Sequence, residues 1–208
     1  MLELNPQQTA EWIQARVGKV TASRVADIIG LDSRGNYRAG RQNYMAEKVV
    51  ELMTGLPYES GFQSKEMRRG TEVEPEARSA YEALRGVLVD TVGFVDHPTV
   101  ERFGASPDGL VDDDGLIEIK CPNTWNHFQT RLYHKIDGGY MTQMQCQLAC
   151  TGRAWCDYVS YDDRVKEELR LCVIRVERDE EAIKKIIAEV LSFNRDVLTL
   201  VAKLEAAA

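Results

Sequence analysis

Residues 104–122 read GASPDGLVDDDGLIEIKCP, and the rest of the chain is organised around this stretch. Ser-Pro-Asp-Gly at 106–109 is a turn signal, and Asp-Gly at 114–115 is a second one. A short run in which apolar and charged residues alternate, 116–120, follows the second turn. Short extended segments separated by such turns predict a β-hairpin.

The alternation within Leu-Ile-Glu-Ile-Lys indicates which side chains share a face of the sheet. Successive side chains of a strand point to opposite faces, so Glu118 and Lys120 share one face. Ile117 and Ile119 point to the other face, which suits burial. Asp108 comes from the first turn, so the hairpin should gather two carboxylates and an ammonium group near the end of a sheet.

These side chains suit metal-assisted phosphodiester hydrolysis. Two carboxylates, helped by the backbone carbonyl of Ile119, are hard oxygen ligands that suit Mg²⁺, with Mn²⁺ as a substitute. A lysine beside the metal can orient an attacking water, help to deprotonate it, or neutralise charge in the transition state. Each fragment alone has an ordinary explanation, because SPDG is a common turn and E-x-K a common charge pair. Their occurrence on one predicted hairpin favours the site.

The pattern P-D, a gap and E-x-K resembles the signature of the restriction-endonuclease-like, or PD-(D/E)XK, nuclease superfamily. The longer string SPDG…LIEIKCP resembles the branch that contains phage lambda exonuclease and related viral recombination nucleases. Other segments resemble this branch in the same order: Trp12 with Arg16, GKVTAS at 18–23, Gly70 with Glu74, and Gln143 with Gln145. The similarity spans about residues 11–165.

The resemblance implies a pocket for a terminal 5′-phosphate. Its implied ligands are Arg16, Ser23, Ser106 and Gln143, and the same comparison places Trp12 and Gln145 near DNA or the active site. From the residues alone, 7–17 predicts a short helix with Trp12 and Arg16 on one face. Thr21 is a good N-cap for a second helix, so the hydroxyls there also have a purely structural explanation.

Glu74 has two interpretations. Thr71 and Glu74 form a capping-box pattern at the start of a helix expected over 71–85, with Pro75 in its first turn. The resemblance instead implies that Glu74 faces the metals, with Glu72 or Glu76 in that place if the register is shifted.

Two polar segments carry candidate DNA contacts. The loop expected at 31–40 contributes Arg34 and Arg38, with Arg41 adjoining it, although such arginines are often only solvated. The loop expected at 56–70 places Lys65, Arg68 and Arg69 around an apolar residue. By resemblance that residue, Met67, is a wedge near the fork of the duplex.

The composition is typical of a soluble globular protein, with 208 residues, 44% hydrophobic and 28% charged. We expect one nuclease domain over 1–208, because this length fits a single core. No apolar run approaches the ~20 residues that span a bilayer. The first residues lack a secretory signal, and five cysteines without a C-x-x-C pair indicate free thiols rather than zinc ligands or disulfides. A cytoplasmic location is expected, that of the host if the chain is phage- or prophage-encoded.

The net charge of −7 argues against a generic nucleic-acid binder with a basic surface. It does not exclude a nuclease, because metal-binding carboxylates belong to such a site and basic residues can line one channel. The three histidines, His97, His127 and His134, are expected to be non-catalytic, since Lys120 already occupies the position of a base.

The predicted fold is α/β: a restriction-endonuclease-like central mixed β-sheet, with the hairpin in its middle and helices on its faces. Expected strands cover 87–96, 154–161 and 168–177, and expected helices cover 41–54, 124–132, 140–150 and 179–204. Gly55 should end the first of these helices. The long last helix is interpreted as a packing or oligomer helix.

The expected function is a Mg²⁺-dependent 5′→3′ exonuclease that degrades one strand of linear duplex DNA to mononucleotides. The resemblance further implies processive action, a homotrimeric ring around DNA ends and a single-strand annealing protein as partner in phage-type recombination. Two alternatives remain open: a PD-(D/E)XK endonuclease or junction resolvase, and a non-catalytic DNA-end-binding or packaging protein. Strand polarity, oligomeric state and the number of metals do not follow from the residues unaided.

Overall fold

The predicted hairpin forms and lies at the centre of the larger sheet. The computed structural model describes residues 7–58 and 65–207, and in it β5 (Gly109–Val111) pairs antiparallel with β6 (Gly115–Lys120). The sheet has the order β2-β5-β6-β7-β8, with β2 at Val89–Asp90, β7 at Trp155–Tyr161 and β8 at Leu171–Glu177. Only β6 and β7 run parallel, so the sheet is mixed, as predicted.

A smaller sheet leads the chain into the hairpin. It has the order β1-β4-β3, with β1 at Val20–Thr21, β4 at Phe103–Ala105 and β3 at Val95–Asp96. The single strand expected over 87–96 is therefore wrong, because its two ends pair with different partners. Its first part, β2, joins β5, whereas β3 joins β4 in the smaller sheet.

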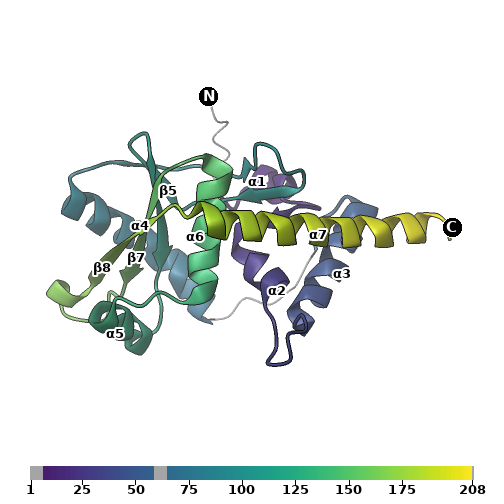
Figure 1. Cartoon of the computed structure of the whole chain (residues 1–208). Helices are drawn as coiled ribbons and strands as arrows, with labels where there is room; N and C mark the ends of the chain where they lie inside the picture. Colours follow the sequence, from purple (N-terminus) through teal and green to yellow (C-terminus); the bar gives the residue numbers. More distant parts are fainter. Residues whose placement is uncertain (1–6, 59–64, 208) are drawn as a thin grey trace.

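Helices cover both faces of the larger sheet (Figure 1). Those beside the hairpin are α4 (Lys65–Arg85), α5 (Thr124–Tyr133) and α6 (Gly138–Thr151). On one face Leu116 packs with Met144 and Leu148 of α6. On the other face Ile117 and Ile119 pack against α4. Glu118 and Lys120 follow the alternation of Leu116, so they point toward α6.

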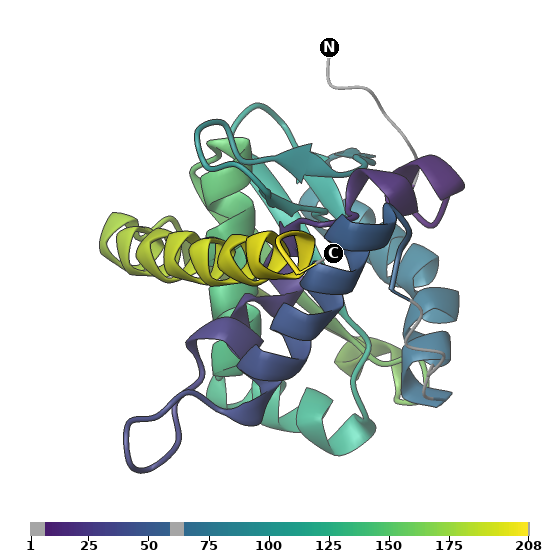
Figure 2. The ribbon, with the colours of Figure 1, turned by 90° about the vertical axis from the view of Figure 1, so that its right-hand side faces the viewer.

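The remaining helices are α1 (Ala10–Ala15), η1 (Ala22–Arg24), α2 (Val25–Ile29), α3 (Ala39–Thr54), η2 (Glu167–Leu169) and α7 (Glu180–Glu205). Of these, η1, α2, α3 and α7 build a second core beside the sheet. Gly55 ends α3 in the left-handed conformation, at φ 68°, as expected. Figure 2 shows α7 crossing in front of α6 and alongside α3.

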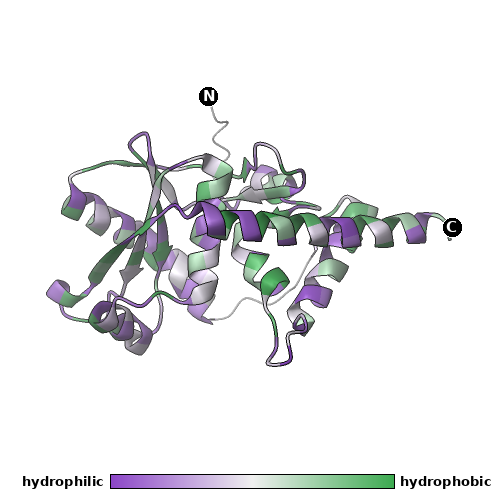
Figure 3. Ribbon diagram, viewed as in Figure 1, coloured by the Kyte–Doolittle hydropathy of each residue, from purple (hydrophilic) through white to green (hydrophobic). Residues whose placement is uncertain are grey.

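The long helix α7 packs along one side only. Its buried residues recur at helical spacing and include Val190 and Phe193, and the Phe193 ring stacks on Tyr44 of α3 at 5.6 Å between centroids. In Figure 3, α7 alternates between hydrophobic and hydrophilic colours. The expected packing role of α7 is confirmed. No helix in the described part of the chain is long and apolar enough to cross a membrane.

The helix predicted to begin at Thr71 is longer than expected. By residue 65 the chain is already helical, so Thr71 and Glu74 do not form a capping box and Pro75 is an internal residue of α4. Tertiary contacts explain the difference, because Arg69 in the additional turn donates to the backbone of Cys121 at 3.0 Å and to Asp162 at 3.1 Å. These bonds offset the backbone hydrogen bond that a proline nitrogen lacks.

Gly115 offers a test of packing at the start of β6. A Cβ atom there would lie 2.0 Å from the Trp155 ring, which Arg175 covers from 3.5 Å. Gly115→Ala should therefore lower the free energy of unfolding by about 1–3 kcal/mol. Gly70→Ala is the control, since nothing lies within 4 Å of its Cβ position and a helical alanine should stabilise by about 0.5–1 kcal/mol. Urea denaturation measures both changes, and equal effects would contradict the packing argument.

Candidate active site

Glu118 is the most enclosed functional group of the hairpin. Its side chain is 1% exposed, and it accepts hydrogen bonds from the Lys120 ammonium, from Gln143 Nε2 at 2.7 Å and from Gln147 Nε2 at 2.5 Å. The predicted sharing of one face by Glu118 and Lys120 is thus confirmed. Because a buried carboxylate requires partners, these three donors make its position possible.

Asp108 reaches the same strand from the turn before β5. The Ile119 backbone N–H donates to Asp108 Oδ2 at 2.6 Å. Pairing between β5 and β6 ends at Ile117, so this edge of β6 is left to Asp108. The hairpin therefore brings Asp108, Glu118 and Lys120 together.

The charges at this site strongly influence one another. Burial, reinforced by the negative charge of Glu118, raises the pKa of Asp108 well above its usual range. Burial alone would lower the pKa of Lys120, but the charges of Glu118 and Asp108 raise it. Lys120 is therefore held as a cation, and its ammonium also lies 4.9 Å from the centre of the Tyr140 ring.

A cleft of about 400 Å³ opens at the end of β6, and of these charged groups Lys120 lines it. Ile119 and Lys120 line it from β6, and Glu74 lines it from α4. Glu74 also accepts from Arg78 at 2.8 Å. Neither Glu72 nor Glu76 lines the cleft, and Glu76 instead accepts from Tyr161 at 2.6 Å. Of the three acidic residues considered, Glu74 is the one whose position suits the expected role.

The glutamines of α6 divide into two groups. Gln143 and Gln147 are four residues apart and both contact Glu118. Gln145 points away: its amide donates to the Glu177 carbonyl and its oxygen accepts from the Asp179 N–H, both at 2.9 Å. The expectation that Gln145 lies at the active site is wrong, since it joins α6 to the start of α7. Gln147 was missed, although its spacing from Gln143 was a usable signal.

A second pocket, of about 260 Å³, contains part of the predicted phosphate site. Trp12, Arg16 and Ser23 line it, and the Arg16 guanidinium stacks 4.0 Å from the centre of the Trp12 ring. Ser106 lies beside it, where its Oγ accepts from Trp12 Nε1 at 2.9 Å. Gln143 is not in the wall of this pocket, because its amide is directed at Glu118.

Four charged residues that line this pocket were not predicted: Arg24, Glu47, Lys48 and Glu51. Lys48 and Glu51 form a buried ion pair at 2.5 Å, and Glu51 also accepts from the Gly18 N–H at 2.8 Å. Burial lowers the pKa of Lys48 despite the opposing influence of Glu51. In the sequence, the i,i+3 spacing of Lys48 and Glu51 is also that of an ordinary ion pair on the surface of a helix, so it does not indicate that this pair is buried.

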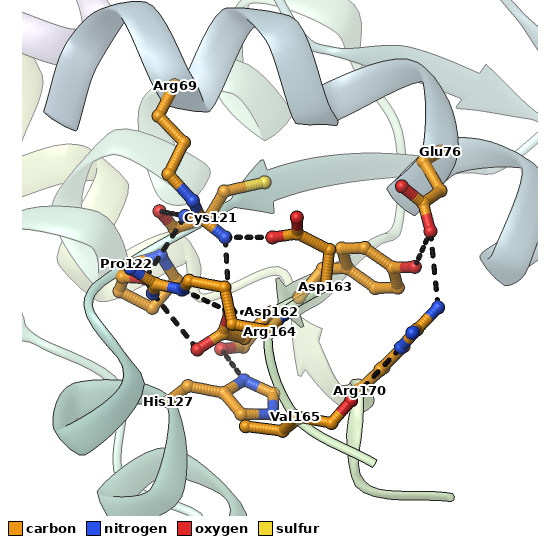
Figure 4. A network of polar contacts seen from close by, with 12 residues as sticks. Arg69, Glu76, Cys121, Pro122, His127, Asp162, Asp163, Arg164, Val165 and Arg170 are labelled. Atoms are coloured by element: carbon orange, nitrogen blue, oxygen red, sulfur yellow. Dashed lines mark hydrogen bonds and ion pairs between the residues drawn. The ribbon is translucent and has the colours of Figure 1, made fainter. Parts of the chain in front are cut away.

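Two of the expected DNA-contacting arginines have structural partners instead. Arg41 is buried, where it donates to the Ile28 carbonyl at 3.2 Å and to Asp196 of α7 at 3.0 Å. Arg69 points toward the Cys121 and Pro122 carbonyls and toward Asp162 and Asp163 (Figure 4). Neither guanidinium is therefore available to DNA.

Other members of the expected basic segments remain exposed. Arg34, Arg38, Lys65 and Arg68 are all on the surface. Met67 falls in α4, but its side chain lies outside the described residues, so its expected wedge role stays a prediction.

The network in Figure 4 fixes the loop that follows β7. Burial would raise the pKa of Asp162, but hydrogen bonds, foremost from Arg164, lower it to about 2. His127 is also structural, since its ring nitrogens lie 2.8 Å from Ser160 Oγ and 2.7 Å from the Leu169 carbonyl. These contacts hold the loop against the end of β6, next to the cleft.

Comparisons with known proteins agree with this geometry. The model of the YqaJ-like viral recombinase domain matches residues 11–154. The chain belongs to this family. No curated protein compared with the chain matches it.

Among solved structures, an alkaline exonuclease from Laribacter hongkongensis, LHK-Exo, is 48% identical, with 96% of this chain and 97% of that chain covered and a TM-score of 0.88. Its complex with dAMP matches equally well. A phage-related exonuclease from Haemophilus somnus 129PT is 17% identical over 89% of this chain and 96% of that chain, with a TM-score of 0.71, and it shows the fold alone. The predicted restriction-endonuclease-like fold and the resemblance to lambda-exonuclease-type nucleases are confirmed.

The donors of this YqaJ-like chain fit a divalent cation that keeps part of its water. Within residues 7–58 and 65–207, no three His, Cys, Asp or Glu side chains group closely enough to hold a metal ion. Mg²⁺ commonly takes only one or two carboxylates and completes its shell with water and phosphate oxygens. Asp108 and Glu118 supply two carboxylates beside the uncovered edge at Ile119. Burial and the negative charge of Glu118 raise the pKa of Asp108, and a cation there would offset the second of these causes.

Gln147 provides a test of how Glu118 is held. Gln147→Leu keeps the approximate shape but removes a donor to the carboxylate, and partners of metal ligands typically contribute about 10- to 100-fold in metal affinity. We expect a loss of that size in the affinity for Mn²⁺, measured by calorimetry. The same change at the exposed Gln14 of α1, Gln14→Leu, should leave affinity unchanged. Equal affinities in all three proteins would mean that Gln147 does not support a metal site.

Proposed function

We propose that the protein is a Mg²⁺-dependent 5′→3′ exonuclease that degrades one strand of linear duplex DNA to mononucleotides during phage-type recombination by single-strand annealing. Membership of the viral recombinase family and 48% identity to an alkaline exonuclease support a DNA exonuclease acting in recombination. A structure of that relative holds dAMP, a deoxynucleoside monophosphate, which supports mononucleotide products.

The observation that carries the proposal is the convergence of Asp108, Glu118 and Lys120 at the end of β6. Bound Mg²⁺ would supply Lewis-acid stabilisation of a phosphoryl oxygen and an activated water. Asp108, Glu118 and the Ile119 carbonyl would hold it, with Glu74 lining the cleft from α4. Gln143 and Gln147 keep Glu118 in one orientation. The Lys120 cation can offset negative charge that develops on the phosphate.

The separate pocket around Arg16 supports action at chain ends. Its guanidinium stacks on Trp12, and Trp12 is hydrogen-bonded to Ser106, which lies two residues before Asp108. A terminal phosphate at Arg16 and Ser23 would therefore be linked to the position of the catalytic carboxylates. This connection favours exonucleolytic hydrolysis that starts at a 5′ end over endonucleolytic cleavage within a strand.

We further propose a homotrimeric ring, with exposed Arg34, Arg38, Lys65 and Arg68 toward the DNA. A closed ring would repeat the basic residues of a chain whose net charge is −7. The proposed partner is a single-strand annealing protein, and the proposed location is the cytoplasm, that of the host for a phage- or prophage-encoded protein. Mn²⁺ is the proposed substitute for Mg²⁺.

Asp108→Asn tests the metal site. The change removes a charged ligand but keeps the shape, so hydrolysis of a linear duplex with Mg²⁺ should fall at least ~1000-fold, as is typical when an essential group in an electrostatic site is lost. The products of the parent protein should be mononucleotides from linear ends, and covalently closed circles should remain intact. Circular dichroism should show an unchanged fold. Near-normal hydrolysis by Asp108→Asn, or nicking of closed circles by the parent, would contradict the proposal.

Arg16→Ala tests recognition of the 5′ end. The parent should digest a 5′-phosphorylated duplex faster than a 5′-hydroxyl duplex. A hydrogen bond to a charged group is worth about 1.5–3 kcal/mol, so Arg16→Ala should remove most of a preference of roughly 10- to 100-fold. Arg195→Ala, a change at an exposed arginine of α7, should keep the preference. Equal rates of the parent on both ends would remove the reason for placing a phosphate at Arg16.

A further inference from the structure

A third cavity, of about 540 Å³, adjoins the catalytic cleft. It lies between α5 and the beginning of α6, and it shares Pro122 and Tyr140 with the cleft. Tyr133, Lys135 and Tyr158 are also in its walls. None of its wall residues belongs to the pocket around Arg16.

The position of this cavity relative to Glu118 follows from the residues on one face of α6. Tyr140, Gln143 and Gln147 recur at i, i+3 and i+7, so they share one face of the helix. The two glutamines contact Glu118, whereas Tyr140 lies about one turn, ~5 Å, nearer the helix N-terminus. The Lys120 ammonium lies 4.9 Å from the centre of the Tyr140 ring. The cavity therefore begins one helical turn beyond the catalytic carboxylate.

The pocket around Arg16 lies in the opposite direction. That pocket is lined by α1 and by the part of α3 that carries Tyr44 and Glu51, and α1 lies near the top of the molecule while α5 lies at the bottom in both Figure 1 and Figure 2. A strand whose first phosphate lies at Arg16 and whose next phosphate lies at Asp108 and Glu118 has to leave the cleft on the other side. The cavity beside α5 is at that exit.

The walls of the cavity have the chemistry that a nucleotide requires. Lys135 is exposed and forms no ion pair with any residue that the structure describes. Tyr133 is 69% exposed, and the rings of Tyr140 and Tyr158 stack at 6.0 Å. Bases stack on aromatic rings, and lysines contact phosphates. Asp137 is also in the wall, but its carboxylate accepts from the Gly139 N–H at 2.8 Å and so caps α6.

We propose that this cavity binds the nucleotide on the 3′ side of the scissile phosphate, in the strand that is being digested. Lys135 contacts the phosphate of that nucleotide, and Tyr133 stacks on its base. This inference rests on the proposed exonuclease function, and it adds a subsite that holds the incoming strand in line with the catalytic carboxylates.

A neutral phosphate linkage tests the Lys135 contact. The substrate is a 5′-phosphorylated duplex in which the linkage one nucleotide 3′ of the scissile phosphate is a methylphosphonate. For the parent, this change should raise KM with Mg²⁺, and Kd with Ca²⁺ by fluorescence anisotropy, roughly tenfold, because a charge-assisted contact is lost. Lys135→Gln should bind the unmodified duplex roughly tenfold more weakly and should be indifferent to the methylphosphonate. Lys184→Gln, at an exposed lysine of α7, should behave like the parent.

The stacking contact has its own pair of variants. Tyr133→Ala should weaken binding roughly tenfold, and an abasic site at the same nucleotide should then add nothing, whereas Tyr133→Phe should behave like the parent. The inference is overturned if the methylphosphonate lowers the affinity of Lys135→Gln by the same factor as it lowers that of the parent. Equal losses would mean that the lysine and the phosphate act independently of each other. The binding measurements require no cleavage, so a parent protein that binds ends without hydrolysing them would contradict the proposed function while the Kd values still decide this subsite.

Discussion

The enclosed carboxylate of Glu118 is the constraint on which the rest of the structure depends. A carboxylate that is 1% exposed is costly to bury, and here three donors from two elements compensate it. Lys120 comes from the same strand, and Gln143 and Gln147 come from α6. The helix must therefore lie across that face of the sheet at one height and rotation, which Met144 and Leu148 secure by packing on Leu116.

On the opposite face of the sheet, α4 supplies part of the cleft wall. Ile117 and Ile119 pack against α4, and the first turn of that helix is tied down by Arg69. The contacts of Arg69 thus fix the position of α4, the helix from which Glu74 lines the cleft. Two arginines that the sequence suggested as DNA contacts are therefore structural. Arg69 holds α4 beside the cleft, and Arg41 joins α3 to α7. A guanidinium presents several donors in a fixed plane, which suits both tasks.

Three hollows lie along the route that we propose for the digested strand. They are the pocket around Arg16, the cleft at Lys120 and the cavity beside Lys135. The hydrogen bond between Trp12 and Ser106 connects the first to the second, and Tyr140 is shared by the second and the third. In the function we propose, one strand would follow this path past a single reacting position.

The hairpin, its central place in a mixed sheet and the convergence of Asp108, Glu118 and Lys120 could all be predicted from the sequence. Those features depend on turn residues and on the two-residue alternation of a strand, which are local. Only the tertiary structure decided that α4 begins before Thr71, that Gln145 turns toward α7, and that Gln147 rather than Gln145 reaches Glu118. The partners responsible, such as Asp162 for Arg69 and Glu177 for Gln145, are distant in the chain. Helical spacing says which residues share a face, but the direction of that face is set by packing against elements far away in the sequence.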